Sequence, residues 1–406
     1  MTELSEESSS ASSPGRVSRL LYLGPFATMA DRFAVAPLLI PMAVSFHVSL
    51  GAVSGAASLY YLAYGLMPPV YGVLADRFGR VRVIRAALVG TAVADVLSTL
   101  SPNLTTLLVA RFLTGGIACG VFPTTLVYLA DRFPFKVRQQ AITNVLVFVA
   151  LGTTAGTLGA GLTAHVLSWR FFFLIPAALA LAVAIALRGI PESLLTQSSQ
   201  NAVRQVASVL RHGWALFLLI LAVLVGAVMF GFLTYLAPAL EAAGQSPALA
   251  GAVAASYGLS VLLCIRIFAY VARRTPAALM LAGGAGMLLV GYLIAAAAQS
   301  VAAILAASIL AGGAYAFMQS TFQTWATDIV PEARGTATSL FATAIFAGAA
   351  LATAGVAGLA SSHRYSSLFV IAAIATLPVL LVGGLARWRY AGSDAIDGAK
   401  RGSQIG

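Results

Sequence analysis

The chain has 406 residues, of which 60% are hydrophobic and only 9% are charged, and its mean hydropathy is +0.92. Soluble domains are about half apolar and about a quarter charged, so this composition excludes a water-soluble globular protein. The net charge of +11 does not indicate nucleic-acid binding, because most basic residues fall in short loops that alternate along the chain. That distribution is typical of the positive-inside pattern of membrane proteins.

Twelve apolar runs follow one another along the chain, each about the 20 residues that a helix needs to cross a hydrocarbon core of roughly 30 Å. They are too long and too uniformly apolar for barrel strands, so we predict an all-α, polytopic membrane protein. The predicted spans are 20–42, 51–74, 82–100, 104–130, 140–163, 169–188, 213–238, 248–271, 276–298, 301–327, 335–360 and 365–387.

The loops that share a side with the two chain ends hold most of the arginines, which predicts that both termini are cytoplasmic. Segment 1–19 is Ser-rich and lacks the basic start of a signal peptide, so we predict a disordered cytoplasmic tail. The alanine- and arginine-rich, lysine-poor composition favours a bacterial source. The expected location is therefore the bacterial plasma membrane.

The longest internal loop, 189–212, is polar and divides the spans six and six. We predict two six-helix bundles at 20–188 and 213–387, joined by this cytoplasmic linker and followed by a cytoplasmic tail at 388–406. An internal repeat relates the bundles, since Leu-x-Gly-Gly at 113–116 recurs at 310–313 and Asp131 recurs as Asp328. A duplicated unit of this kind places a binding site near the membrane midplane, between the halves.

A short charged segment lies between the second and third spans, Gly72-Val-Leu-Ala-Asp-Arg-Phe-Gly-Arg80. In a chain with so few charges, Asp76, Arg77 and Arg80 beside Gly72 and Gly79 indicate a tight charged turn with a function. The alternative is a topology anchor, whose arginines are simply retained in the cytoplasm. An anchor needs neither the aspartate nor the glycines.

This segment resembles the signature loop of the major facilitator superfamily, and Arg111-x-x-x-Gly115-Gly116 in the fourth span resembles the superfamily's fourth-helix arginine motif. With twelve spans and a six-plus-six repeat, the likeness extends over residues 16–390. It implies two pseudo-symmetric bundles that rock about a central site, and an inner gate in which Arg80 bridges Asp76 and Asp131. The expected gate residues are Gly72, Asp76, Arg77, Gly79, Arg80, Asp131, Arg334 and Gly335.

Within the superfamily, the chain is similar to the twelve-span drug:proton antiporter branch, which has an acid in helix 1, the helix-4 arginine and a glycine motif in helix 5. The glycine motif is met at Gly152, Gly156 and Gly161, whereas Thr157 stands where that branch has proline. The resemblance implies a secondary transporter that exports a small, lipophilic molecule by proton antiport with alternating access.

Asp31 lies about eleven residues into the first span, roughly 16 Å along it and so near the bilayer centre. An ionised carboxylate there costs on the order of a few kcal/mol, and acids inside membranes are functional by default. We expect Asp31 to bind a proton or to contact substrate, with Arg111 as its partner. Two alternatives stay open: a structural acid paired with the adjacent Arg32, and an Arg111 that snorkels to the outer interface.

Two further charges within spans have no assigned role. Asp95 lies near the outer end of the third span, where an acid reached by water is as plausible as a functional one. Arg266, in the eighth span, lies above Arg273 and Arg274, and we expect it to snorkel toward the inner interface.

Spans one, four, seven and ten line the central cavity in proteins of this family, which makes Tyr235, Tyr315, Gln319 and Gln323 candidate substrate contacts. The last three share one helical face, and amides that face lipid would be unfavourable. For the aromatic side chains, ordinary packing or an interfacial belt is the alternative.

The sequence contains no phosphate-binding Gly-x-x-x-x-Gly-Lys, His-Glu-x-x-His or Gly-x-Ser-x-Gly pattern. We therefore expect no enzyme activity, no metal and no cofactor, with the proton gradient as energy source. The expected partners of this monomer are protons, a small-molecule substrate and the lipid bilayer. The alternatives are a proton-coupled or facilitative importer on the same fold and, more remotely, a non-transporting membrane receptor or enzyme.

Overall fold

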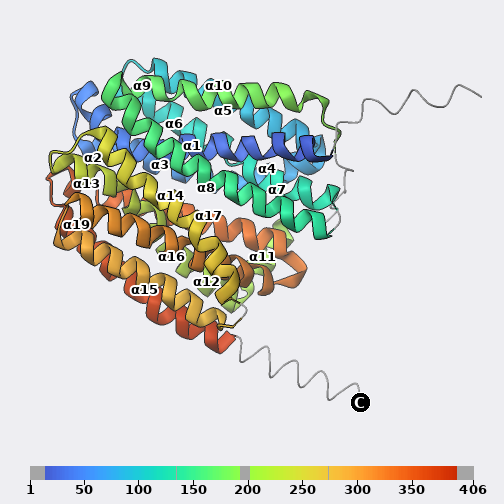
Figure 1. Cartoon of the computed structure of the whole chain (residues 1–406). Helices are drawn as coiled ribbons and strands as arrows, with labels where there is room; N and C mark the ends of the chain where they lie inside the picture. Colours follow the sequence, from blue (N-terminus) through green and yellow to red (C-terminus); the bar gives the residue numbers. More distant parts are fainter. Residues whose placement is uncertain (1–13, 134, 193–201, 273, 391–406) are drawn as a thin grey trace, which may run out of the picture.

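The computed structural model describes residues 14–133, 135–192, 202–272 and 274–390, and these residues form helices and no strand (Figure 1). Eleven helical segments are long and apolar enough to cross a membrane, and one bent helix pair makes a twelfth. The predicted all-α, polytopic membrane class is therefore confirmed. The described ends of the chain, near Pro14 and Tyr390, lie at the same end of the bundle.

The N-terminal half of the chain packs α1 along α8 and α10, and α5 along α6 and α10. α6 and α7 together form one span. The elements of this half are α1 Pro14–Phe46, α2 Leu50–Val53, α3 Gly55–Leu66, α4 Pro68–Phe78, α5 Arg80–Leu100, α6 Leu104–Ala118, α7 Val121–Arg132, α8 Phe135–Val166, α9 Trp169–Phe172, α10 Leu174–Ala186 and the 3-10 turn η1 Leu187–Gly189.

The C-terminal half packs α14 and α15 on α16, and α12 on α17. Its elements are α11 Ala202–Arg211, α12 Gly213–Gly226, the π-helical turn η2 Ala227–Gly231, the 3-10 turn η3 Phe232–Tyr235, α13 Leu236–Ala242, α14 Pro247–Val271, α15 Ala277–Ala297, α16 Val301–Asp328, η4 Pro331–Ala333, α17 Arg334–Gly355, α18 Ala357–Ser361, α19 Tyr365–Pro378 and the π-helical turn η5 Val379–Gly383. α11 lies in the segment predicted as a linker, of which residues 193–201 are outside the described part.

Small polar residues begin several spans at the end of the bundle opposite the described chain ends. Asn103 Oδ1 accepts a hydrogen bond from the Thr106 amide at 2.9 Å, and Ser300 Oγ accepts one from the Ala303 amide at 3.3 Å. Such caps satisfy amides that a helix start leaves without an intrahelical partner. They explain why the polar turns at 101–103 and 299–300 end one span and begin the next.

Two predicted spans are less regular than their apolar patterns indicate. The second breaks at Met67 into α3 and α4 with a bend of 49°, because Pro68 and Pro69 lack amide donors and disfavour helix at the residue before them. The seventh changes from α-helix to π and 3-10 turns between Ala227 and Tyr235. No proline marks that change, so the sequence pattern did not reveal it.

The predicted glycine motif lies on α8, where Gly152 and Gly156 let the neighbouring helix approach the backbone. A Cβ on Gly152 would lie 2.4 Å from the Phe26 carbonyl oxygen, and one on Gly156 would lie 2.1 Å from that of Ala30. Both neighbours are on α1, close to Asp31. Glycine at these positions therefore allows the helix that carries the intramembrane acid to pack directly on α8.

The two halves of the chain meet along two seams, which we name by their helices. In the α8–α14 seam, a Cβ on Gly161 would lie 2.3 Å from the Pro247 carbonyl oxygen and 2.9 Å from the Cα of Gly251. In the α3–α17 seam, the Thr343 hydroxyl donates to the Gly65 carbonyl oxygen at 2.7 Å. Small residues therefore bring the halves into backbone contact at both places.

A reciprocal glycine contact fixes α12 against α17. A Cβ on Gly226 would lie 1.7 Å from the Ile345 carbonyl oxygen, and one on Gly348 would lie 1.8 Å from that of Val223. We expect Gly348→Ala to cost about 1–3 kcal/mol, as overpacking usually does, and to lower the thermal unfolding midpoint of the purified protein in detergent. Gly355→Ala, on the same helix with no atom within 4 Å of the added Cβ, is the matched control; equal midpoints would contradict the prediction.

Candidate functional site

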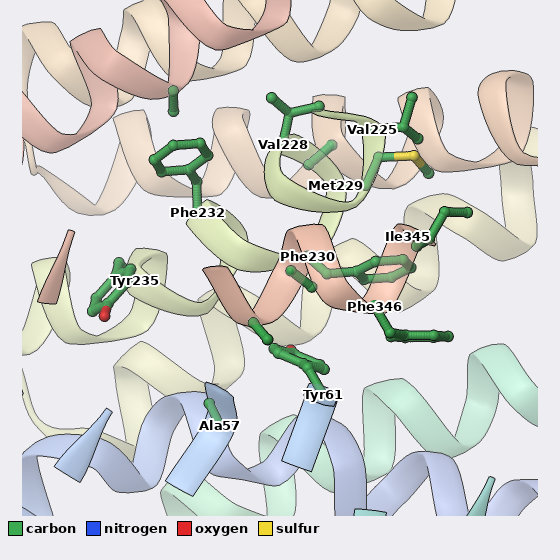
Figure 2. Close-up of a cluster of buried hydrophobic side chains, with 14 of the residues drawn as sticks. Ala57, Tyr61, Val225, Val228, Met229, Phe230, Phe232, Tyr235, Ile345 and Phe346 are labelled. Carbon is green, nitrogen blue, oxygen red and sulfur yellow. The ribbon is translucent and has the colours of Figure 1, made fainter. Parts of the chain in front are cut away.

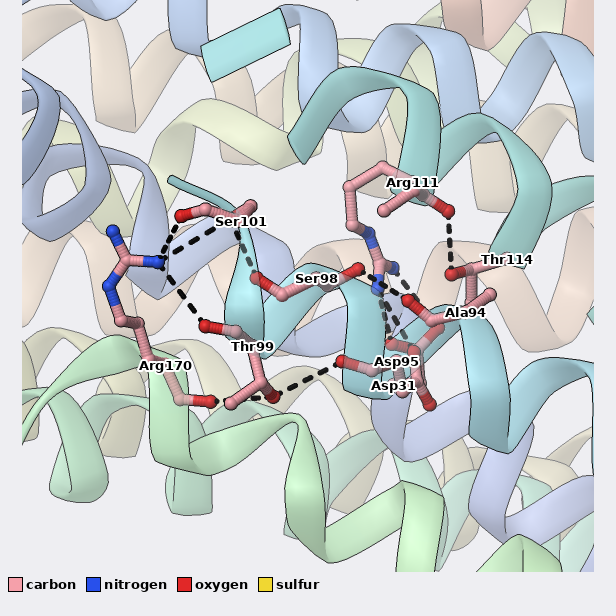
Figure 3. A network of polar contacts seen from close by, with 10 residues as sticks. Asp31, Ala94, Asp95, Ser98, Thr99, Ser101, Arg111, Thr114 and Arg170 are labelled. Carbon is pink, nitrogen blue, oxygen red and sulfur yellow. Dashed lines mark hydrogen bonds and ion pairs between the residues drawn. The ribbon is translucent and has the colours of Figure 1, made fainter. Parts of the chain in front are cut away.

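Three ionisable side chains from three helices meet inside the N-terminal half (Figure 3). Asp31 of α1, Asp95 of α5 and Arg111 of α6 each have side chains that are 0% exposed. Arg111 donates from Nη1 to Asp31 Oδ1 at 2.6 Å and from Nη2 to Asp31 Oδ2 at 3.0 Å. Nη1 also lies 3.4 Å from Asp95 Oδ1. We call these three residues the acid–arginine cluster.

Aromatic rings close the cluster off on the arginine side. The guanidinium carbon of Arg111 lies 4.9 Å from the centroid of the Tyr60 ring and 4.8 Å from that of Phe173. Charges held in apolar surroundings must satisfy one another, because unpaired burial is expensive. The geometry thus agrees with the Asp31–Arg111 pairing expected from the sequence and leaves no room for a snorkelling Arg111.

The charges of the cluster do not balance. One guanidinium neutralises one carboxylate, so the second carboxylate leaves a surplus negative charge unless one of the acids holds a proton. Asp95 Oδ2 and Arg111 Nε have no hydrogen-bond partner among the described residues. One proton shared by the two acids would therefore make the cluster neutral.

Asp95 joins the site although its place near the end of a span had left its role open. Thr99 and Ser101, at the end of the same helix, form hydrogen bonds with Arg170 (Figure 3). The signal that was available is the number of charges within the N-terminal spans, where two acids, Asp31 and Asp95, accompany Arg111. Arg266 lies in α14, but its side chain is outside the described part of the structure.

The charged turn between α4 and α5 forms a bridge between three side chains. Arg80 donates from Nη1 to Asp76 Oδ1 at 2.9 Å and from Nε to Asp131 Oδ2 at 2.8 Å. The bridge ties the end of α4 to the end of α7, the contact that the family resemblance implied. Arg334 and Gly335 begin α17 and take no part in this bridge, and a Cβ on Gly72 or Gly335 would have no atom within 4 Å.

Glu192, which follows η1 in the chain, contacts this turn and had no role predicted from the sequence. Its carboxylate accepts hydrogen bonds from the amides of Val81 at 3.0 Å and Arg82 at 2.9 Å, at the first turn of α5. A carboxylate at a helix N-terminus is stabilised by the helix dipole. One hint of a role for Glu192 was present in the sequence, because it is the only acid between Asp131 and Glu241.

Gly79 is required in this turn for two reasons. Its φ is +96°, in the left-handed region that favours glycine. A Cβ there would also lie 2.6 Å from Glu192 Oε2. The turn therefore depends on glycine both for its backbone conformation and for the approach of the carboxylate.

Of the four residues predicted to line a central cavity, one is packed inside the C-terminal half and three lie on α16. Tyr235 is buried within the C-terminal half and donates to the Thr353 carbonyl oxygen at 2.5 Å, which is a packing role in this conformation. Tyr315, Gln319 and Gln323 lie on α16, where the Tyr315 ring contacts Phe230 at 5.9 Å. The side-chain oxygen of Gln319 is buried and has no hydrogen-bond partner in the described part of the chain, so it is an acceptor available for a ligand.

Comparison with curated proteins gives partial matches to a triacylglyceride transporter and to quinolone resistance proteins. The chain is 27% identical over 131 residues to a triacylglyceride transporter of Mycolicibacterium smegmatis, covering 32% of this chain and 23% of that protein. It is 26% identical over 157 residues to the quinolone resistance protein NorB of Staphylococcus aureus, covering 39% of this chain and 34% of that protein. The alignments thus span about a third or less of these relatives.

Solved structures share the fold over nearly the whole chain. A bacterial homologue of the human lysosomal transporter Spinster, inward-facing and occupied, matches with a TM-score of 0.71 at 20% identity, covering 94% of this chain and 98% of that one. The nucleoside transporter NupG matches with a TM-score of 0.75 at 14% identity, covering 92% and 99%. At these identities the likeness shows the fold alone.

A family model covers the length of the helical region. The model described as Major Facilitator Superfamily matches residues 21–353 and, in a second match, residues 236–402. Together with the twelve-span architecture, the charged turn and the acid–arginine cluster, this match decides the assignment. The chain belongs to the Major Facilitator Superfamily.

Proposed function

We propose that this member of a transporter superfamily exports a small, lipophilic molecule in exchange for protons across a bacterial plasma membrane. The observation that carries the proposal is the acid–arginine cluster, in which two buried carboxylates share one guanidinium. A site of this composition gains and loses a proton with little rearrangement, because the partner already lies within reach of both acids. Asp31 is the proposed proton carrier, and Asp95 is the alternative partner of Arg111.

The coupling of protonation to movement follows from the contacts of Arg111. A proton on Asp31 removes the charge that holds both guanidinium nitrogens, and Asp95 Oδ1, at 3.4 Å from Nη1, is the nearest remaining anion. Arg111 then turns from α1 toward α5. α1 packs on α8 through Gly152 and Gly156, and α8 in turn forms a seam with the other half. A movement of α1, once Arg111 no longer holds Asp31, is therefore transmitted to the seam.

The names of the partial relatives support export of lipophilic molecules, because one is a quinolone resistance protein and another a triacylglyceride transporter. An importer on the same fold is the second candidate. Thr157 favours an importer, because it replaces the proline of the drug:proton antiporter motif. Structural neighbours also include a D-xylose–proton symporter. Direction of proton movement separates the two.

Liposomes that contain the purified protein and a trapped pH-sensitive dye test the proposal. The vesicles are acidified inside, and quinolones, cationic dyes and acylglycerols are added outside one at a time. Antiport is expected to raise the internal pH when a transported compound enters, because protons leave in exchange. A compound that carries protons in its own direction identifies a proton-coupled importer. The absence of any compound-dependent proton movement contradicts both antiport and proton-coupled import.

Asp76→Asn tests the gate role of the charged turn with a compound that passes this screen. The substitution keeps the shape of the side chain but removes the charge that holds Arg80, so we expect compound-driven proton movement to fall several-fold with normal membrane insertion and yield. Arg82→Gln, which removes an exposed charge from the same turn, is expected to have little effect. Unchanged transport in Asp76→Asn would leave only the topology-anchor role.

A further inference from the structure

Arg32 follows Asp31 in the chain but lies in a separate aromatic environment. Its side chain is 7% exposed, and its guanidinium carbon lies 4.6 Å from the ring centroids of both Phe230 and Phe346. Three more rings lie within 6 Å: Phe33 at 5.1 Å, Tyr64 at 5.2 Å and Tyr61 at 5.8 Å. We call these five rings the aromatic cage.

The cage is assembled by both halves of the chain at the α3–α17 seam. Tyr61 and Tyr64 come from α3, while Phe346 comes from α17 next to the Gly65 contact. Phe230 comes from the π-helical turn η2, and π-turns of this kind are frequent at functional sites. Figure 2 shows Phe230 and Phe346 side by side, facing Tyr61 across the seam.

The guanidinium of Arg32 has few hydrogen-bond acceptors around it. Among the described residues, Nε and Nη2 have no partner, Nη1 lies 4.0 Å from Met29 Sδ, and the Tyr64 hydroxyl also interacts with the guanidinium. The ion pairs found among the described residues do not include Arg32. Aromatic faces stabilise the positive charge by about 0.5–2 kcal/mol, but they do not satisfy the N–H groups that lie in the guanidinium plane.

Arg170 is an arginine of this protein that combines a ring contact with hydrogen bonds. Its guanidinium carbon lies 4.4 Å from the Trp169 ring centroid. Its Nη1 also donates to the carbonyl oxygens of Thr99 at 3.2 Å and Ser101 at 2.5 Å. Arg32 has five rings but no acceptor for Nε or Nη2 within the described part of the chain, so these two donors are open to a group from outside it.

The two free donors define the chemistry of that group. Nε–H and Nη2–H lie on one edge of the guanidinium plane and point in parallel, a spacing that matches the two oxygens of a carboxylate. An ammonium group would be repelled by the charge, and a carboxamide offers one neutral acceptor in place of two charged ones. Flat or apolar parts of a ligand would pack on the surrounding rings.

We propose that Arg32 and the aromatic cage bind the carboxylate of an amphiphilic substrate, whose apolar part packs on the rings. The inference rests on the proposed function insofar as the bound molecule is the transported one. It assigns an anionic substrate class to the proposed transporter. Because the cage spans the seam, movement of the halves would open and close access to Arg32.

The test compares acids with their amides on the purified full-length protein in detergent. A thiol-reactive coumarin maleimide reports thermal unfolding as buried Cys119 becomes accessible. The probes are 1-naphthylacetate, indole-3-propionate, 4-phenylbutyrate and decanoate, each beside its carboxamide. At least one acid is expected to raise the unfolding temperature at concentrations about tenfold below those its amide requires, as expected for a charge-assisted pair.

Three variants assign that preference to the guanidinium. Arg32→Gln is expected to make acid and amide equivalent, and Arg32→Lys to keep only part of the difference, because an ammonium group lacks the paired donors. Should Arg32→Gln fail to fold, Arg32→Lys decides. Arg170→Gln, which alters a ring-stacked arginine outside the cage, is expected to keep the full preference.

Equal shifts for every acid and its amide in the wild-type protein would overturn the inference, as would a preference that survives in Arg32→Gln and Arg32→Lys. The measurement uses no proton gradient, so it is independent of coupling. An Arg32-dependent preference without compound-driven proton movement would contradict only the proposed antiport. Proton movement without any preference for acids would contradict only the carboxylate site.

Discussion

Asp31→Asn is expected to reduce compound-driven proton movement in acid-loaded vesicles to the level of protein-free vesicles, with the protein still folded. Asparagine keeps an acceptor for Arg111 but neither titrates nor attracts the guanidinium as a charge. Arg111 is then left with Asp95 as its only anionic partner. It can no longer move between Asp31 and Asp95, and the proposed coupling depends on that movement. Exchange of a labelled compound across vesicles without a gradient should continue, because exchange needs no net proton transfer.

Two companion variants define the specificity of this result. Asp95→Asn leaves Arg111 permanently on Asp31 and is also expected to uncouple transport. Glu241→Gln removes a partly buried acid of the C-terminal half, whose Oε1 has no partner among the described residues. It lies away from the cluster and should leave coupling intact. Proton movement that persists in Asp31→Asn, or that disappears equally in Glu241→Gln, would contradict the assignment of coupling to the cluster.

Arg111→Met is expected to be the most destabilising single substitution in the cluster, with a cost of about 3–5 kcal/mol. Methionine fills similar space between Tyr60 and Phe173, but it leaves Asp31 and Asp95 buried without a counter-charge. The measurement is thermal unfolding of the purified protein in detergent, compared with the wild type at the same pH.

A double-mutant cycle separates loss of charge pairing from loss of packing. If the cost arises from stranded carboxylates, Asp31→Asn in the Arg111→Met background should recover much of the lost stability, so the two effects will not add. Additive effects would show that the arginine acts mainly through its contacts with the rings. The pairing energy would then be too small to support the proposed switch.

The spans could be predicted because the membrane itself sets their length. The predicted span at 301–327 corresponds to α16, Val301–Asp328, which begins at the Ser300 cap. The bend at Met67 was readable from the two prolines that follow it. The π-turn at Ala227–Gly231 was not, since it arises from packing against α17 and leaves no trace in hydrophobic periodicity.

For the candidate site, the sequence allowed the pairing of charged residues to be predicted but not their aromatic surroundings. Asp31 and Arg111 could be expected to pair, because each is too costly to bury alone in lipid. Arg32 was considered as a partner for Asp31, but successive helical residues point about 100° apart, and Arg32 faces a different set of helices. Its cage brings together residues as distant as Tyr61 and Phe346, and a single sequence does not show which faces of those helices meet.

In the proposed transport cycle, the two seams fix where the halves turn. α1 lies between them: Phe33 stacks on Tyr257 of α14 at 5.6 Å beside one seam, and Arg32 contacts Phe346 of α17 at the other. If the seams act as the hinge, displacement grows with distance from the line that joins them, and groups close to that line barely move. A carboxylate held at Arg32 would then stay almost in place during the cycle, while first one side of the membrane and then the other gains access to it.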